Sequence, residues 1–527
     1  MHIDQKTFYQ SNDLIRDYLE GKIPDLHGPL FSAENILKQA TVREFSDQKR
    51  MVLVDSLKKQ YENLELSPKV SSNIDLLLQS NVFTITTGHQ LNIFTGPLFF
   101  FYKILQVINI TEELNKNNQN QKFVPIFWMA SEDHDFDEIA QFSIGDKKFK
   151  WKRDVQDAVG RISTEGLSEI FKEVKDCIGH DSHGALTVFE EYCKKGLLGK
   201  ATLFLANELF GKYGLVIVDG DQKDLKRVFQ NTLRKELVQS LAHLEIHDVI
   251  SKFDKKGYKV QVNPREVNLF LLHDQKRGRI IKESEVYKIA NSSLEFKEAD
   301  ILDLLEKQPE KFSPNVVMRP MYQETILPNV AYLGGAGEIA YWLELKSAFE
   351  KYGVPFPILV VRNSLLLVES KAEKKLNILN IELPHYLKDE SVLIKEFIQT
   401  NSEELNMEQE EQLLSELQSI LLDKSSAIDV SLKQAIEASL VRQKKELKRI
   451  ENKFIKVLKQ KKKHDIEAIQ FVKNSFYPNG VFQERYENIT PYLASFGLEF
   501  IDLLKGKIGA FDPKVELVFL NTNEDHT

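Results

Sequence analysis

Two short polar segments of the sequence combine residue types that can bind an anion or move a proton. Residues 86–92 read TTGHQLN, where Gly88 allows close backbone approach to a ligand and His89 can donate to a phosphate or to developing charge. Residues 132–138 place five carboxylates and one imidazole in seven positions, which suits a general base or Mg²⁺ ligands. A glycine-assisted turn and a solvated acidic loop are the structural alternatives for the two segments.

Two further segments carry similar chemistry nearer to the C terminus. Arg319 can clamp a carboxylate or a phosphate through two hydrogen bonds, although a structural salt bridge would use the same side chain. Residues 333–342, LGGAGEIAYW, place three glycines in four positions ahead of a helix-like pattern, which again suits close approach to a ligand. Residues 478–480, PNG, predict a turn first and a binding loop second.

Four short apolar runs must position these polar segments. They cover residues 82–86, 124–130, 215–219 and 357–361, and polar or charged residues follow each run. Short buried strands that alternate with helices indicate an α/β core with a parallel sheet, in which ligands bind outside the carboxyl ends of the strands. We therefore expect the polar segments to meet at one edge of this sheet.

A long helical stretch follows the last of these runs. Residues 402–473 contain neither Gly nor Pro, and from Ile436 the apolar residues follow the alternating four- and three-residue spacing of a coiled coil. Its partner is either residues 403–422, across a turn near Ser425-Ser426, or a second subunit. The ordinary core of a helical bundle would give the same apolar stripe.

The changes of pattern along the chain predict six parts. Residues 1–80 form a helical region joined to the core, and residues 245–318 form an inserted α+β subdomain. The remaining parts are the first part of the core (81–244), its second part (319–400), the coiled-coil domain (401–473) and a C-terminal segment that returns to the core (474–527).

The composition excludes several classes of protein. The 527 residues include 70 Lys and Arg against 78 Asp and Glu, a net charge of −8 without a basic block, which argues against a surface for nucleic acid or anionic lipid. The apolar residues 93–110 are interrupted by Gly96-Pro97 and Lys103, so we expect a buried loop and helix there rather than a membrane span. The polar N-terminal residues and the presence of only Cys177 and Cys193 predict a cytoplasmic protein.

Together these motifs resemble one family, the cysteine-adding enzymes (cysteine ligases) of bacillithiol synthesis. The resemblance extends over almost the whole chain in order and spacing, with one departure: His89 stands where the usual motif of the family has Gln. The segments that carry it are TTGHQLNIFTGP (86–97), FWMASEDHDFDEI (127–139), GLVIVDGD (214–221), RPMYQETILP (319–328), GGAGEIAYW (334–342) and SFYPNGVFQER (475–485).

The resemblance implies a fold and a reaction. The fold would be α/β, with a Rossmann-like core resembling class I aminoacyl-tRNA synthetases and nucleotidyltransferases, inserted connective subdomains and a helical coiled coil that pairs two subunits as a homodimer. The reaction would add cysteine to glucosaminyl-malate through an amide, as the last step of bacillithiol synthesis. Both substrates are small molecules, and neither nucleic acid nor a membrane takes part. Carboxylate activation would use ATP, with Mg²⁺. Residues 87–90, TGHQ, resemble the class I phosphate loop, but the sequence has no Lys-rich KMSKS loop.

The resemblance also implies roles for individual residues. His89, Asp133, His134 and Asp135 would be catalytic, the last three by orienting the amine or a metal and accepting its proton, although no side chain is assigned as a metal ligand. Arg319 would hold the malyl carboxylate. The residues assigned to substrate or nucleotide binding are Thr87, Gly88, Gln90, Asn92, Thr95, Gly96, Arg319, Gln323, Glu324, Gly334, Gly335, Gly337, Glu338, Tyr341, Asn479, Gly480 and Arg485. Two other functions stay open: a different ATP-dependent, carboxylate-adenylating ligase on the same core, and a non-catalytic dimeric coiled-coil scaffold.

Overall fold

The computed structural model of the protein describes residues 2–402, 407–429 and 431–520. The chain divides into two compact units. The core unit contains residues 4–366 and 481–516, and the coiled-coil unit contains the described residues among 1–3, 367–480 and 517–527. Residues 403–406, where the predicted partner helix begins, and 521–527 of the predicted C-terminal segment lie outside the described residues.

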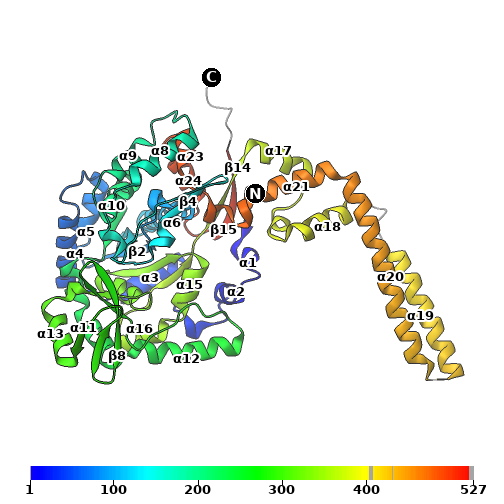
Figure 1. The fold of residues 1–527 in the computed structure, drawn as a ribbon, viewed down its shortest axis with the longest axis horizontal. Helices are drawn as coiled ribbons and strands as arrows, with labels where there is room; N and C mark the ends of the chain where they lie inside the picture. The colour runs from blue at the N-terminus through cyan, green and yellow to red at the C-terminus, as the bar shows by residue number, and fades with distance from the viewer. Residues whose placement is uncertain (1, 403–406, 430, 521–527) are drawn as a thin grey trace. The chain divides into compact units, whose positions relative to one another are not determined.

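A five-stranded parallel sheet forms the centre of the core unit (Figure 1). Its order is β13 (Ile358–Val361), β12 (Asn329–Gly334), β2 (Val82–His89), β3 (Lys122–Met129) and β6 (Val216–Asp219). Along the chain, β2, β3 and β6 are placed side by side in one direction, and β12 and β13 are then added on the other side of β2. The strand order therefore reverses between β2 and β12, and such a reversal opens a crevice at the carboxyl ends of the two strands.

The predicted parallel sheet is confirmed, and four of its five strands match the apolar runs of the sequence. The fifth strand, β12, was not among them, because Asn329 at its start and Gly334 at its end are residue types that strands disfavour. Asn329 is nevertheless buried, and its side-chain oxygen accepts hydrogen bonds from Thr84 and Thr86 of β2. The polar start of β12 is thus held by the neighbouring strand.

Helices of the core unit cover the sheet. The apolar run at 93–110 forms a turn and then α6 (Phe99–Asn117), whose residues Val107 and Ile110 pack against Phe83, Phe123 and other sheet residues. Within the part of the chain that the structure describes, no helix combines the length and apolar character needed to cross a bilayer. The other helices are α1 (Gln5–Phe8), α2 (Asp13–Leu19), α3 (Ala33–Val42), α4 (Asp47–Gln60), α5 (Pro68–Leu76), α7 (Phe136–Ile139), α8 (Leu167–Ile178), α9 (Thr187–Cys193), α10 (Leu198–Phe210), α11 (Lys223–Gln239), α12 (Leu241–Lys256), α13 (Glu298–Lys307), α14 (Met318–Ile326), α15 (Ala336–Leu343), α16 (Lys346–Tyr352), α22 (Gln483–Tyr486), α23 (Thr490–Phe496) and α24 (Glu499–Lys507).

The predicted insertion contains a second sheet, which is antiparallel. Its order is β10 (Glu295–Lys297), β9 (Val286–Ile289), β8 (Lys276–Glu283), β7 (Leu269–His273) and β11 (Phe312–Pro314). Asp274 and Gln275 join β7 to β8 with positive φ angles of 46° and 57°, the geometry of a tight two-residue hairpin. A small separate hairpin consists of β4 (Gln141–Ile144) and β5 (Lys147–Lys150).

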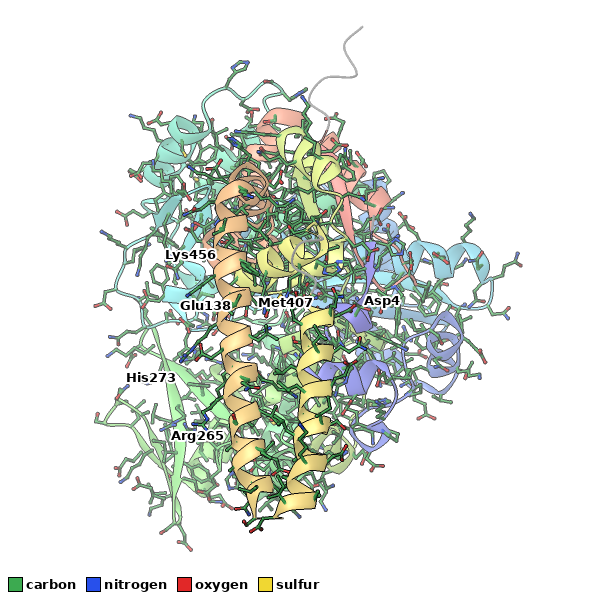
Figure 2. The ribbon with its side chains drawn as sticks, turned by 90° about the vertical axis from the view of Figure 1, so that its right-hand side faces the viewer. Asp4, Glu138, Arg265, His273, Met407 and Lys456 are labelled. Atoms are coloured by element: carbon green, nitrogen blue, oxygen red, sulfur yellow. The ribbon has the colours of Figure 1, made fainter. Side chains whose placement is uncertain are left out.

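Helices form most of the coiled-coil unit. Figures 1 and 2 show α19 (Glu408–Ile428) and α20 (Leu432–Lys461) running side by side within one chain, so the described part of the predicted partner, residues 408–422, is helical and pairs with the long helix. The predicted turn near Ser425-Ser426 is wrong: both serines donate to the carbonyl of Leu422 inside α19, and the helix ends at Ile428. The other helices are α17 (Ser370–Leu379), α18 (Glu390–Thr400) and α21 (Lys463–Phe476), and the chain passes between the units within β1 (His2–Asp4), β14 (Ser364–Glu369) and β15 (Lys514–Leu520) and after Gly480.

Candidate functional site

A cavity of about 370 Å³ lies at the carboxyl end of β3 in the core unit. Residues 128–134, from the end of β3 and the acidic loop, line one side, and Gly220 follows β6. The segment that leads into β7, the inserted antiparallel sheet and α14 line the other side. Their contributions include Arg265, Phe270, Arg277, Arg279 and Arg319. The cavity is therefore where the general rule for parallel sheets places a ligand, and the insertion helps to enclose it.

The cavity wall carries an excess of positive charge. Among the described residues, no carboxylate forms an ion pair with Arg265, Arg277, Arg279 or Arg319. The acidic side chains at the wall are already engaged, because Glu132 pairs with the buried Lys226 and Asp133 accepts several hydrogen bonds. An anionic ligand would supply the missing partners of the arginines.

Asp133 is held as a carboxylate by donors from its own loop and from Gln90, which directly follows β2. Its Oδ2 accepts from Nε2 of Gln90 at 2.8 Å, and its Oδ1 accepts from the backbone N–H groups of His134 and Asp135 at 2.7 and 3.3 Å. Burial raises the pKa of Asp133, but the hydrogen bonds around it, among them those from Gln90 and the two backbone donors, outweigh burial, so the net pKa lies below the usual value. The carboxylate of Asp133 can therefore bind a positively charged or hydrogen-bond-donating group.

The neighbours of Asp133 have different surroundings. Nδ1 of His134 lies 2.9 Å from Nη1 of Arg277, and its ring centroid is 5.3 Å from that of Phe270. Asp135 is exposed and caps α7, since its side chain accepts from the backbone N–H of Glu138 at 3.2 Å. The acidic loop thus brings Asp133 and His134 to the cavity, whereas Asp135 caps the start of α7.

A buried lysine lies at the carboxyl ends of β2 and β12, where the sheet reverses its order. Nζ of Lys103, from α6, donates to the carbonyl oxygen of Gly88 at 2.6 Å and to Oε1 of Glu338 at 2.5 Å. Oε2 of Glu338 accepts from the hydroxyl of Tyr332 at 3.0 Å. Gly334 and Gly335 precede Glu338 at the end of β12, and a Cβ atom on Gly334 would lie 2.9 Å from Cβ of Glu338.

His89 lies beside this lysine. Its ring centroid is 5.2 Å from those of Phe99 and Phe100, and its Nε2 is buried without a hydrogen-bond partner in the described part of the chain. Burial, together with the charges of Lys103 and Arg362, lowers the pKa of His89 well below its usual value. His89 is accordingly a neutral imidazole at neutral pH.

Arg319 lines the cavity and lies near the carboxyl end of β2. Its Nη1 donates to Oε1 of Gln323 at 3.0 Å, and its Nη2 donates to the hydroxyl of Tyr341 at 3.3 Å. A Cβ atom on Gly88 would lie 3.7 Å from Nη1 of Arg319 and 3.3 Å from the hydroxyl of Tyr332. An added Cβ atom would thus make an ordinary contact with the arginine and a tight one with Tyr332.

Several predicted site residues have structural surroundings instead. Thr87 donates to the carbonyl of Leu333 across the sheet, and Glu324 is buried with its Oε1 accepting from Gln323 and Asn329. Asn92, Thr95 and Gly96 form the turn before α6, where a Cβ atom on Gly96 would lie 2.6 Å from Cβ of Asn92. Gly337 has open space around it in α15.

The C-terminal motif is divided between the units. Asn479 and Gly480, both with positive φ, belong to the coiled-coil unit, and Arg485 is an exposed residue of α22 in the core unit. Its neighbour Glu484 is buried and forms a two-pronged ion pair with Arg362. Neither residue was predicted to belong to the site, although Glu484 stands in the motif at 475–485 and Arg362 directly follows the predicted strand at 357–361.

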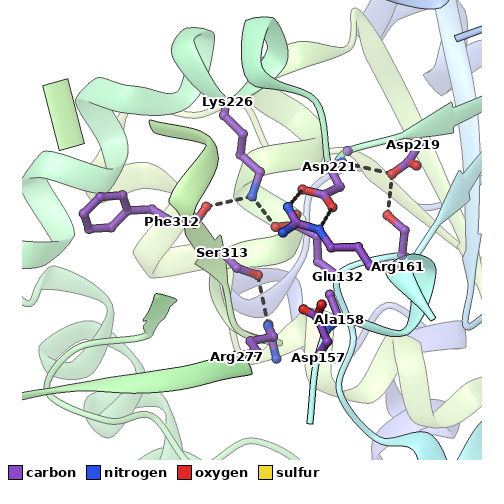
Figure 3. Close-up of polar contacts among 12 residues, drawn as sticks. Glu132, Asp157, Ala158, Arg161, Asp219, Asp221, Lys226, Arg277, Phe312 and Ser313 are labelled. Atoms are coloured by element: carbon purple, nitrogen blue, oxygen red, sulfur yellow. Dashed lines mark hydrogen bonds and ion pairs between the residues drawn. The ribbon is translucent and has the colours of Figure 1, made fainter. Parts of the chain in front are cut away.

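Figure 3 shows a polar network behind the acidic loop that the sequence analysis also missed. Lys226 of α11 donates to Glu132 and to the carbonyl of Phe312, and Arg161 forms a two-pronged ion pair with Asp221. Ser131 donates to Asp219 at the end of β6. These contacts fix the loop on which Asp133 and His134 lie. The signal in the sequence for these contacts is the position of Asp219 and Asp221 at and just after the end of β6.

The fold and site define a class: a Rossmann-like α/β protein with an inserted antiparallel sheet, an arginine-lined cavity and a helical coiled-coil domain. The chain belongs to the BshC family of bacillithiol biosynthesis. The description "Bacillithiol biosynthesis BshC, N-terminal Rossmann-like domain" matches residues 1–363, and "Bacillithiol biosynthesis BshC, C-terminal coiled-coil domain" matches residues 365–520. The predicted family, Rossmann-like fold and coiled-coil domain are confirmed, and the chain is an enzyme of a ligase family.

Relatives named "Putative cysteine ligase BshC" match nearly the whole chain. The protein of Flavobacterium johnsoniae is 40% identical over 98% of this chain and 99% of its own length. That of Christiangramia forsetii is 38% identical over 96% of each chain, and that of Bacillus cytotoxicus is 26% identical over 86% of this chain and 87% of its own. A crystal structure titled as a putative arginyl tRNA synthetase from Campylobacter jejuni covers 88% of this chain and 99% of its own at 11% identity, with a TM-score of 0.24, a similarity too low to argue from.

Proposed function

We propose that the protein joins the carboxylate of cysteine to the amine of glucosaminyl-malate, as the last step of bacillithiol synthesis. The names of its relatives support the cysteine substrate. The choice of glucosaminyl-malate as the acceptor of the cysteinyl group rests on the cavity wall, where four arginines lack carboxylate partners among the described residues. A malate group carries carboxylates that such guanidinium groups bind in two-pronged geometry.

Each side of the cavity has a part in this proposal. Arg265 and Arg279 of the insertion, with Arg319 of α14, hold the malyl carboxylates. Asp133, which stays ionised, orients the attacking amine at the opposite wall. The amine lone pair forms the new C–N bond, the leaving group departs with the electron pair of its bond to the carbonyl carbon, and the amine loses one proton to the acidic loop or to water.

Amide formation from a free carboxylate is uphill in water, so we propose ATP as the co-substrate that supplies the leaving group when bound. The unpaired arginines and the buried, unpartnered Nε2 of His89 fit the recognition of a polyanion. Within the described residues, no three His, Cys, Asp or Glu side chains are grouped to hold a metal ion. We therefore place any Mg²⁺ on the phosphates of the nucleotide.

We also propose that the protein is a cytoplasmic homodimer paired through its coiled-coil unit. Leu413 and Leu417 of α19 and Ile450 of α20 are exposed and line one groove on the helix pair. Phe454 and Val457 continue the exposed apolar stripe along α20. A second copy of the same helix pair presents the same stripe and would cover it.

Reconstitution tests the reaction. The purified protein is incubated with cysteine and glucosaminyl-malate, with and without ATP, and the products are analysed by mass spectrometry. We expect a product with the mass of the amide and nucleotide cleavage in step with it. Amide formation with another carboxylate but not with cysteine would favour the alternative ligase, and the absence of any ligand-induced rise in melting temperature would favour the scaffold.

A further inference from the structure

The contact with Arg277 determines whether Nδ1 of His134 donates or accepts a hydrogen bond. Nη1 of Arg277 lies 2.9 Å from Nδ1 of His134. A guanidinium group has donors and no acceptor, so Nδ1 must accept this hydrogen bond. A proton on Nδ1 would place two N–H groups face to face at this distance. A neutral ring that accepts at Nδ1 carries its proton on Nε2.

The other candidate partner of Nδ1 is the carboxylate of Asp133, which would favour the opposite tautomer. Its Oδ1 is farther away, at 3.5 Å, and already accepts from the backbone N–H groups of His134 and Asp135. Its Oδ2 accepts from Gln90. Asp133 is therefore well supplied with donors without the imidazole.

Arg277 is itself held in place on every side. Figure 3 shows its hydrogen bond to Ser313, in which Nε donates to Oγ at 3.1 Å, and Nη2 donates to the carbonyl of Pro314 at 2.8 Å. The guanidinium group also lies 3.9 Å from the ring centroid of Phe270. Two neutral acceptors and one aromatic ring thus orient the guanidinium group, with Nη1 directed at His134.

We propose that Arg277 is a positioning residue that holds His134 as the neutral tautomer with its proton on Nε2, so that His134 donates a hydrogen bond to the substrate carbonyl oxygen. This assignment rests on the proposed amide formation, where that oxygen gains negative charge as the C–N bond forms. A preorganised N–H donor stabilises such charge. The proposed donor role differs from the role of proton acceptor that the family resemblance implies for His134.

The tautomer is measured by NMR on the full-length protein with ¹⁵N-labelled histidine, because an unprotonated ring nitrogen resonates far from a protonated one. His134→Gln identifies the His134 signals among those of the 12 histidines. We expect an unprotonated Nδ1 and a protonated Nε2 at neutral pH. A proton on Nδ1, or on both nitrogens, in the wild-type protein would overturn the proposal without the need for any further variant.

Arg279 offers a matched control, because it lies two residues further along β8 and lines the same cavity without contacting His134. We expect Arg277→Met to mix the two tautomers and to lower kcat by roughly 10- to 100-fold. Arg279→Met should leave the tautomer unchanged and raise KM instead. An unchanged tautomer in Arg277→Met would refute the positioning role. If the protein does not ligate cysteine but His134 has the stated tautomer, the proposed function and the catalytic role of His134 are wrong while the positioning role of Arg277 stands. Failure of the proposed function and failure of the positioning role are therefore distinguishable.

Discussion

Lys103 and Glu338 join the two strands between which the sheet reverses its order. Nζ of Lys103 reaches both the carbonyl oxygen of Gly88 on β2 and Oε1 of Glu338, which follows β12. The lysine side chain is 1% exposed, whereas that of Glu338 is 30% exposed. Burial lowers the pKa of Lys103, and the carboxylate of Glu338 opposes this shift.

This asymmetry predicts unequal costs for removing either partner. Glu338→Gln leaves a buried ammonium group without a counter-ion, which should lower the free energy of unfolding by about 1–3 kcal/mol. Lys103→Met should cost less, because water can solvate the more exposed carboxylate. Urea unfolding of both single variants and the double variant gives the coupling energy. Costs that add within about 0.5 kcal/mol would show that the pair is not coupled.

The arginines of the insertion are predicted to bind the substrate anion. Arg265→Met and Arg279→Met each remove a guanidinium group that has no carboxylate partner in the described chain, so neither should leave a buried charge unpaired. We expect each to raise KM for glucosaminyl-malate about 10-fold, the loss of one charge-assisted hydrogen bond, with a smaller change in kcat. Steady-state kinetics at two salt concentrations measures both. An unchanged KM in both variants would remove the insertion from substrate recognition.

The sequence predicted the parallel sheet because its strands are short apolar runs bounded by polar residues. It predicted the acidic loop for the same reason, since Asp133 and His134 directly follow β3. It could not predict Arg277 as a neighbour of His134, because 143 residues separate them and the contact depends on how the inserted sheet folds over the core. In the sequence, Lys103 stands out only as an interruption of an apolar run, because no local sequence pattern reveals its partner Glu338, which is 235 residues away.

Asp219 should make the stability of the protein depend on pH. Burial, followed by the negative charge of Asp221, raises the pKa of Asp219 from 3.8 to about 6. The folded state therefore binds this proton more tightly than the unfolded state, and the resulting stabilisation is lost as pH rises from about 4 through 6. Asp219→Asn keeps an oxygen acceptor for Ser131 and removes the charge. We expect it to be more stable than the wild-type protein at pH 7, by roughly 1–3 kcal/mol.

The measurement for Asp219 is the difference between the two unfolding curves across this pH range. Glu324 and Glu344 also have pKa values raised to about 7 by burial, so the wild-type slope alone is not specific to one residue. The difference should be small near pH 4 and should grow as pH rises. Parallel curves throughout would mean that Asp219 titrates normally in the folded state.

The exposed stripe of the coiled-coil unit predicts the oligomeric state. Leu417→Lys combined with Ile450→Lys places two charges in the apolar groove and should convert a dimer into a monomer. Lys456→Glu changes the charge of an exposed α20 residue that does not line the groove, and should leave the dimer intact. Light scattering after gel filtration measures both masses. A monomeric wild-type protein would contradict the prediction at once.

Gly220 offers a test of the cavity that depends on packing rather than charge. A Cβ atom at this position would lie 2.7 Å from the Trp128 ring and 3.0 Å from that of Tyr322, which pack edge to face against each other. Because Trp128 lines the cavity and is buried, its ring can move only by disturbing the ligand site. Gly220→Ala should therefore destabilise the protein by about 1–3 kcal/mol and raise KM for glucosaminyl-malate.

Gly506 is the matched control for this substitution. It lies in α24, where an added Cβ atom meets nothing within 4 Å. Gly506→Ala should stabilise the protein by up to about 1 kcal/mol, because alanine loses less conformational freedom in a helix than glycine does. Urea unfolding and steady-state kinetics compare the two variants. If Gly220→Ala matched the wild-type protein in both measurements, Trp128 would have room to move, and the tight wall that the structure gives this side of the cavity would be wrong.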